Sequence, residues 1–196
     1  PEPLARPISN FLSAQTGPIS KTAELLRLQF PCLKSVTVRR DWFKKSTRLH
    51  VELYSSLGRV GQKNRSFYLS EDGVLFSAPE ALYPEPGVAL EFALGQPDLK
   101  LLARYLAAAR RSDRLVSPIR RLRLISAAEG WEAFFEDGTK ALWGDLNWTE
   151  EKLARLRDVI LDARVSFSGP LTADLRYFED GRILLRPGTE KSISMR

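Results

Sequence analysis

Apolar and polar residues follow two different periodicities along this 196-residue chain, one helical and one typical of strands. A helical pattern of apolar positions runs over residues 19–30 and ends at Pro31. Strict alternation follows over residues 34–40 and again over residues 48–54, which predicts two strands. Together with a short helix predicted over residues 8–15, these segments form a helix–helix–strand–strand unit.

Two stretches near this unit show neither periodicity. Residues 1–7, PEPLARP, contain three prolines and are predicted to form a linker. Residues 55–66, SSLGRVGQKNRS, are rich in small and polar residues and are predicted to form a loop.

The tripeptide Glu-Asp-Gly occurs three times, at residues 71–73, 136–138 and 179–181, and each copy lies between apolar or aromatic runs. Asp-Gly between two such runs is a strong hairpin signal, because glycine adopts positive φ at little cost. A catalytic or metal-binding carboxylate pair is the weaker interpretation, since turn chemistry already explains all three copies.

Two amphipathic helices are predicted between these hairpins. One covers residues 97–112, and the other follows Thr149 as its N-cap, with a buried stripe of Leu153, Leu156 and Ile160. A strand over residues 119–126 separates them. The order hairpin, helix, strand, hairpin, helix, hairpin predicts an α+β domain with two helices packed on a mainly antiparallel sheet.

Composition narrows the classes of function. The net charge is +6, but the basic residues are scattered, so no nucleic-acid surface is predicted. Cys32 is the only cysteine and lies among apolar residues, which predicts a small buried side chain and excludes an intramolecular disulfide. No apolar run approaches the roughly 18 residues of a membrane span.

Candidate chemistry is sparse. His50 is the only histidine, on the outward face of a predicted strand, so a multi-histidine metal site or a Ser-His-Asp triad is not expected. No nucleotide-binding or metalloprotease motif is present. We therefore predict no catalytic, cofactor-binding or metal-binding residue and no small-molecule substrate. A paired-carboxylate cleft stays open as an alternative, because 24 acidic residues allow many combinations.

Four segments, in order, resemble a known family. Residues 31–54 resemble the helix end and last two strands of a POTRA domain. The segments YLSEDGVLF, GWEAFFEDGTKALWG and ADLRYFEDGRILLRP resemble the domain that follows it in the bacterial cell-division family FtsQ/DivIB, and DLRY is the most specific match. The resemblance implies a POTRA-like domain over residues 1–66, whose first strand is expected upstream, and an FtsQ-type β domain over residues 67–196.

This resemblance also implies a function. The family consists of non-enzymatic, single-pass inner-membrane proteins whose bulk lies outside the cytoplasm at the division septum. Its members hold the coiled-coil proteins FtsB and FtsL and help control septal peptidoglycan synthesis. The membrane helix is expected N-terminal to this chain. The alternatives are a POTRA-type chaperone of outer-membrane protein assembly or secretion, and an enzyme acting on cell-wall glycan.

In the family, the partner is held at the last strands of the second domain. We therefore expect a partner strand to add to the C-terminal sheet edge. Tyr177 is expected to be the aromatic anchor, because it matches the tyrosine that contacts the partner in the family. The other expected contacts are Leu175, Arg176, Phe178 and Glu179 beside it, Leu184, Leu185 and Arg186 on the closing strand, and Glu129.

Two of these assignments carry specific expectations. Alternation along residues 171–178 places Tyr177 on the same face as Leu171, Ala173 and Leu175. The alternative for Tyr177 is an aromatic packed under the helix that begins at Thr149. Glu129 aligns with a position that is basic in relatives, so its contact with the partner is expected to differ in charge.

Overall fold

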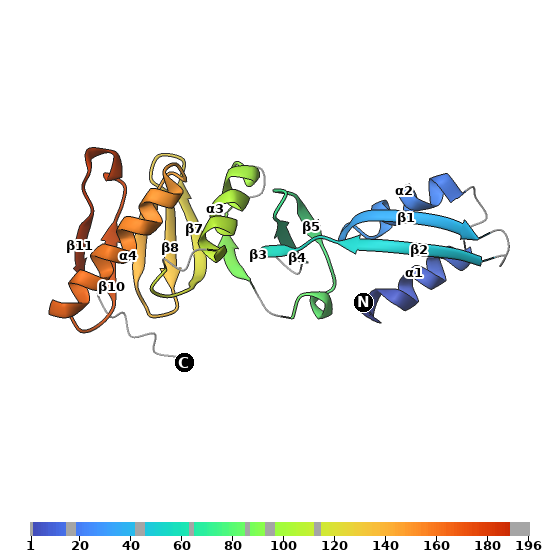
Figure 1. The fold of residues 1–196 in the computed structure, drawn as a ribbon, viewed down its shortest axis with the longest axis horizontal. Coiled ribbons are helices and arrows are strands. Elements are labelled where there is room, and N and C mark those ends of the chain that lie inside the picture. The colour runs from blue at the N-terminus through green and yellow to red at the C-terminus, as the bar shows by residue number, and fades with distance from the viewer. Residues whose placement is uncertain are drawn as a thin grey trace.

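The structure is a computed structural model that describes residues 2–14, 19–41, 46–62, 65–84, 87–92, 97–111 and 115–188. Figure 1 shows an elongated arrangement, with the N-terminal helices and strands at one end and the last two strands at the other.

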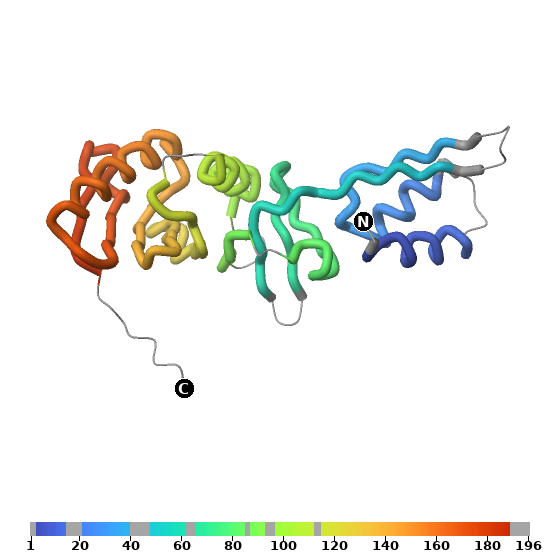
Figure 2. The backbone as a smooth tube through the Cα atoms, turned by 60° about the horizontal axis from the view of Figure 1, so that its bottom comes forward, coloured from blue at the N-terminus to red at the C-terminus, as the bar shows by residue number. Residues whose placement is uncertain are grey.

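The N-terminal unit consists of two helices beside a two-stranded ribbon. Helices α1 (Glu2–Ala14) and α2 (Ile19–Gln29) lie on one side of the antiparallel strands β1 (Leu33–Asp41) and β2 (Ser46–Leu53) (Figure 2). The predicted helix–helix–strand–strand order is therefore confirmed.

The linker prediction for the first seven residues is wrong, because residues 2–7 form the first half of α1. Leu4 and Ile8, one turn apart, are 2% and 7% exposed and pack in the apolar core of this unit. Pro3 lies in the first turn, where no N–H is required, and Pro7 removes only one bond of the helix. Burial of the apolar face outweighs the local effect of the prolines.

The other strands of the described residues form one sheet of nine strands. In chain order they are β3 (Ser56–Gln62), β4 (Arg65–Ser70), β5 (Leu75–Ser77), β6 (Val88–Glu91), β7 (Ile119–Ser126), β8 (Gly130–Phe135), β9 (Lys140–Gly144), β10 (Leu171–Asp174) and β11 (Leu184–Pro187). Their order in space is β11-β10-β9-β8-β7-β6-β3-β4-β5. Short 3₁₀ helices, η1 (Glu80–Leu82) and η2 (Phe178–Asp180), lie in two connections.

The α+β class is confirmed, and the sheet is mixed. Helix α3 (Leu99–Arg111) connects β6 to β7, and α4 (Thr149–Ser166) connects β9 to β10. Both crossovers join parallel neighbours, as helical crossovers do, and β3 also lies parallel to β6. The hairpin signals in the sequence did not reveal these parallel pairs. Both helices cover the same face of the sheet (Figure 1).

The loop predicted over residues 55–66 is wrong, because most of it forms β3 and the start of β4. A Cβ at Gly58 would lie 2.7 Å from the carbonyl oxygen of Val88 on β6. Glycine is therefore needed here for close strand approach rather than for a turn. The predicted domain boundary between residues 66 and 67 falls inside β4 and stays a prediction.

The larger apolar core lies between α3, α4 and the sheet. The predicted stripe of Leu153, Leu156 and Ile160 is confirmed, with each side chain at most 3% exposed. Trp131 and Trp143 are also buried. Trp143 packs edge-on against Tyr105 of α3 at 5.0 Å between ring centroids, and burial raises the pKa of Tyr105.

A second, smaller core joins the N-terminal unit to the end of the sheet. Phe76 of β5 stacks on Tyr54 at 5.2 Å and on Tyr68 of β4 at 5.8 Å. Tyr83 lies 4.8 Å from Tyr68, and its hydroxyl donates a 2.6 Å hydrogen bond to the carbonyl of Tyr54. Burial raises the pKa of Tyr83 to about 12. Cys32 is buried in the same core, as predicted, and burial raises the pKa of its thiol.

All three Glu-Asp-Gly copies form turns with a left-handed glycine. Gly73, Gly138 and Gly181 have φ values of 75°, 83° and 72°. The first two turns are tight, since Ser70 N–H donates to Val74 O and Phe135 N–H to Thr139 O, both at 2.9 Å. The third turn belongs to a longer connection between β10 and β11 that contains η2.

Candidate functional site

The candidate site is the edge formed by β11, the terminal strand of the nine-stranded sheet. Within the described residues, no strand pairs with its outer side. On the inner side, β11 pairs antiparallel with β10, with Leu185 opposite Ala173 and Arg186 opposite Thr172. An open edge of this kind presents unpaired main-chain groups to any strand that approaches.

The register determines which groups point outward. Gly188 N–H donates to Pro170 O at 2.7 Å, and Leu175 N–H donates to Leu142 O of β9 at 2.9 Å. Hydrogen-bonded positions alternate along an antiparallel pair. Odd-numbered residues of β10 therefore bond to β9, and even-numbered residues of β10 bond to β11. Their register partners, the even-numbered residues of β11, bond inward, whereas the N–H and C=O of Leu185 and the C=O of Pro187 point outward. Since proline has no N–H, Pro187 removes one outward donor from the edge.

Strand β10 ends earlier than its sequence predicts. The carboxylate of Asp174 accepts hydrogen bonds from the main-chain N–H of Arg176 at 3.1 Å and from its guanidinium at 2.9 and 2.6 Å. This side-chain turn competes with strand geometry and directs the chain out of the sheet. Hydrogen bonds from Arg176 lower the pKa of Asp174, although partial burial opposes them.

Because β10 ends at Asp174, Leu175 and Tyr177 lie outside the strand in which the sequence placed them. Leu175 is 0% exposed and packs in the larger core, so the structure does not place it at the partner surface. Tyr177 lies in the turn after the strand, so the prediction that it shares a strand face with Leu171, Ala173 and Leu175 is wrong.

Tyr177 itself is 49% exposed. The alternative that it packs beneath α4 is therefore also wrong. The guanidinium of Arg176 lies 6.0 Å from the Tyr177 ring centroid, within the range of a cation–π contact. Phe178 follows, begins η2, and is only partly exposed.

Glu179 is tied to a residue that was not predicted for this site. Its carboxylate accepts a 3.1 Å hydrogen bond from the indole N–H of Trp148. Trp148 is 53% exposed and is the non-glycine residue with positive φ, 55°, among the described residues. A bulky residue in this region stores strain of about 1–3 kcal/mol.

Trp148 also takes the N-cap position predicted for Thr149. Thr149 is the first residue of α4, and its hydroxyl donates to the Leu146 carbonyl at 2.8 Å instead of capping the helix.

The three residues predicted on the closing strand lie on two faces. Leu184 is 55% exposed and, with the exposed Arg186, lies on the sheet face that α4 does not cover. Leu185 lies on the α4 face and packs partly against the larger core. A partner strand added to β11 would therefore lie beside Leu184 and Arg186 on one face of the sheet and beside Leu185 on the other.

Glu129 lies at the same end of the sheet as the β10 turn. It is exposed in the turn between β7 and β8, and its N–H donates to the hydroxyl of Ser126 at 3.0 Å. The pKa of Arg176 is raised mainly by its bond to Asp174, and the charge of Glu129 contributes to the same shift. The structure thus brings Glu129 close enough to Arg176 for their charges to interact.

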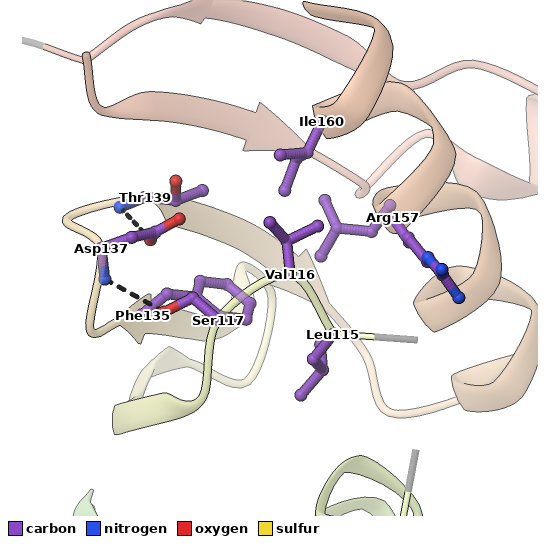
Figure 3. A pocket seen from close by; sticks show the side chains of 9 residues that line it. Leu115, Val116, Ser117, Phe135, Asp137, Thr139, Arg157 and Ile160 are labelled. Carbon is purple, nitrogen blue, oxygen red and sulfur yellow. Dashed lines mark hydrogen bonds between the residues drawn. The ribbon is translucent and has the colours of Figure 1, made fainter. Parts of the chain in front are cut away.

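A small cavity beneath α4 offers no second site. It has a volume of about 10 Å³, roughly one water molecule, and is lined by α4, the β8–β9 turn and the segment before β7 (Figure 3). Asp137 N–H donates to the Ser117 hydroxyl at 3.1 Å, and Thr139 N–H donates to the Asp137 carboxylate at 2.9 Å. These polar groups satisfy one another, so the cavity is a packing feature.

Two further observations limit the chemistry of the described part of the chain. There, no group of three or more His, Cys, Asp or Glu side chains is placed to hold a metal ion. None of the described helices combines the length and apolar composition needed to cross a bilayer.

Comparisons with known proteins assign no family. No family model matches this chain, and no curated protein matches it.

Proposed function

We propose that this protein is a non-enzymatic scaffold of the FtsQ/DivIB type, which holds FtsB- and FtsL-like division proteins by adding their strand to β11. In this proposal the α1–α2–β1–β2 unit is a POTRA-like domain. The chain is anchored in the inner membrane by a preceding helix, acts outside the cytoplasm at the septum, and helps control septal peptidoglycan synthesis.

The single observation that carries the proposal is the open edge of β11 beside exposed apolar side chains. Six exposed large apolar residues lie in the last third of the chain, from the residue before α4 onward: Trp148, Leu161, Val165, Phe167, Tyr177 and Leu184. Exposed apolar surface that borders an open strand edge favours binding to another polypeptide.

Main-chain hydrogen bonds alone give too little affinity. Leu185 and Pro187 present three outward groups, and each hydrogen bond contributes about 1 kcal/mol net. The sum of about 3 kcal/mol is weaker than a millimolar complex, which needs about 4 kcal/mol. Side chains must therefore determine affinity and partner choice, and Tyr177, Leu184 and Trp148 are exposed to do so.

The decisive test removes the outward N–H of β11 and keeps the N–H groups that bond inward to β10. Leu185→Pro deletes the outward N–H, whereas the inward bonds of its even-numbered neighbours remain. Calorimetric titration with the purified extracytoplasmic region of an FtsB-like protein from the same genome should give at least tenfold weaker binding. Leu185→Ala is the matched control, since it shortens the side chain but keeps the N–H, and it should weaken binding much less than Leu185→Pro does.

Tyr177→Ala tests the side-chain anchor in the same titration and should also weaken binding at least tenfold. Equal affinity of the wild type and Leu185→Pro would refute strand addition at β11. The absence of any binding by the folded wild-type protein would refute the proposed partner.

A further inference from the structure

Beside the edge lies a groove that the proposed strand would leave unfilled. It runs between the C-terminal half of α4 and β11 and has a volume of about 510 Å³. Its lining consists of Asp158, Val159, Asp162, Ala163, Val165, Ser166, Phe167 and Leu185.

The groove exists because the helical layer ends before the sheet does. Strands lie about 4.8 Å apart and packed helices about 8–10 Å apart, so one helix covers roughly two strands. Ala173 on β10 is 0% exposed, whereas its register partner Leu185 on β11 is only partly buried. The α4 face of β11 is therefore only partly covered within the described chain.

Apolar side chains at this end of α4 are unusually exposed. Val165 is 87% exposed and Phe167 is 48% exposed, and both line the groove with Leu185. A partner that buries them would remove this apolar surface from water, which favours binding.

Two acidic residues of α4 line the groove. Asp158 and Asp162 lie one turn apart on the groove flank, and neither forms an ion pair with another described residue. Like charges at this spacing repel each other and destabilise a helix. On the opposite flank, Arg157 lines the small cavity of Figure 3 and Arg164 pairs with Asp137.

We propose that this groove binds a basic amphipathic helix. Its apolar side chains would cover Val165, Phe167 and Leu185, and two basic side chains three or four residues apart would meet Asp158 and Asp162. The match in spacing follows from the helical rise, since four residues advance about 6 Å on both helices.

A helix fits the groove better than an extended segment. The backbone of α4 is already bonded within the helix, and the outward groups of β11 point along the sheet plane. An extended segment in the groove would leave its own N–H and C=O groups unpaired, whereas a helix satisfies them internally. A guest helix over β11 would also continue the layer formed by α3 and α4 (Figure 1). The inference rests on the proposed function in that the helix belongs to the partner whose strand adds to β11.

The test uses a synthetic probe so that the groove is examined apart from the edge. The probe is a helical peptide with Leu at positions i, i+3, i+4 and i+7 and Lys on the flanking positions, and its matched control carries Glu in place of Lys. Titration into isotope-labelled protein should shift the amide signals of Val159, Asp162, Val165 and Leu185. The Glu peptide should bind at least fivefold more weakly.

The variant that tests the acidic pair is Asp158→Lys with Asp162→Lys, which should weaken binding of the Lys peptide at least tenfold. Glu71→Lys with Glu136→Lys changes the net charge equally at two exposed turn residues and should leave affinity within twofold. If charge reversal perturbs the fold, Asp158→Ala with Asp162→Ala should still weaken binding about threefold.

The groove and the edge have separable outcomes. Leu185→Pro and Leu185→Ala both remove the Leu185 side chain from the groove, so the two variants should weaken binding of the Lys peptide to the same extent. Only Leu185→Pro also removes the outward N–H, so it should weaken binding of the FtsB-like protein much more than Leu185→Ala does. Unchanged affinity in the Asp158/Asp162 variants, or signal shifts spread over other acidic surfaces, would overturn the groove proposal and leave strand addition intact. Loss of strand addition with the peptide still bound in the groove would refute the proposed function alone.

Discussion

The nine-stranded sheet ends differently on its two sides. At one end, the three-residue strand β5 places Phe76 against Tyr54 and Tyr83, and Phe76 is 2% exposed. At the other end, β11 leaves Leu184 55% exposed and pairs with no described strand on its outer side. One end is joined to the N-terminal unit by aromatic packing, and the other is open.

This difference shows two solutions to the same physical problem. An edge strand is a liability because its unpaired groups recruit other strands. The β5 end meets this problem with a short strand packed against the N-terminal unit, supported by the Lys34–Asp72 ion pair at 3.0 Å. The β11 end relies on Pro187 alone to reduce its outward donors. An edge this open, bordered by exposed Tyr177, is more consistent with binding another polypeptide than with protection against unwanted strand pairing.

The largest predicted effect lies at the closed end. Phe76→Ala should lower the free energy of unfolding by about 3–5 kcal/mol, because it removes the ring at the centre of the junction core and leaves a cavity. Chemical denaturation followed by circular dichroism measures this change.

The matched substitution at the open end is Phe178→Ala, where the ring is only partly buried. Its cost should be at most about 1 kcal/mol. Equal costs at the two positions would contradict the view that aromatic packing closes only the β5 end.

The next effect concerns the alternation of main-chain groups along β11. The amide of Leu185 should exchange with solvent at least tenfold faster than that of Arg186, since only the latter bonds inward to β10. Hydrogen exchange followed by NMR on the free protein measures both rates. Similar protection at the two positions would mean that the outer side of β11 is covered.

Much of the fold followed from local sequence patterns. The stripe of Leu153, Leu156 and Ile160 and the glycines of the three turns were predicted correctly, because helical periodicity and positive φ are set within a few residues. Local rules failed where a distant element decides the outcome. Gly58 belongs to a strand because β6 approaches it, which no neighbouring residue reveals.

The candidate site was less accessible to sequence reasoning. Alternation placed Tyr177 in a strand, but the carboxylate of Asp174 accepts hydrogen bonds from the main-chain N–H and the guanidinium of Arg176, and the strand ends there. Trp148 reaches the site only through a left-handed backbone and its bond to Glu179. A weak hint was present in the sequence, namely a tryptophan at the start of a helix whose apolar stripe begins later, at Leu153.

A smaller, pH-dependent effect is predicted at the turn that ends β10. Asp174→Asn keeps an oxygen for the turn but loses the charged contact with Arg176, and should lower the free energy of unfolding by about 1 kcal/mol near neutral pH. Because the folded pKa of Asp174 is lowered, its contribution is present above the unfolded value of 3.8 and is lost as the pH falls through the folded pKa.

Unfolding titrations of both proteins between about pH 2 and pH 7 measure this difference. Asp72→Asn supplies the comparison at the closed end, where both partners of the ion pair are about half exposed and a smaller loss is expected. A difference between wild type and Asp174→Asn that persists unchanged at the lowest pH would show that the charge of Asp174 does not stabilise the turn.

The smallest predicted effect on folding is at Tyr177, and its smallness is informative. A side chain 49% exposed in a turn contributes little to the core, so Tyr177→Ala should change the free energy of unfolding by at most about 0.5 kcal/mol. The same substitution is expected to weaken partner binding at least tenfold, which corresponds to about 1.4 kcal/mol. Denaturation and titration on one protein sample measure both quantities. A loss of stability as large as the loss of binding energy would mean that Tyr177 supports the turn between β10 and β11, and that its effect on the partner is indirect.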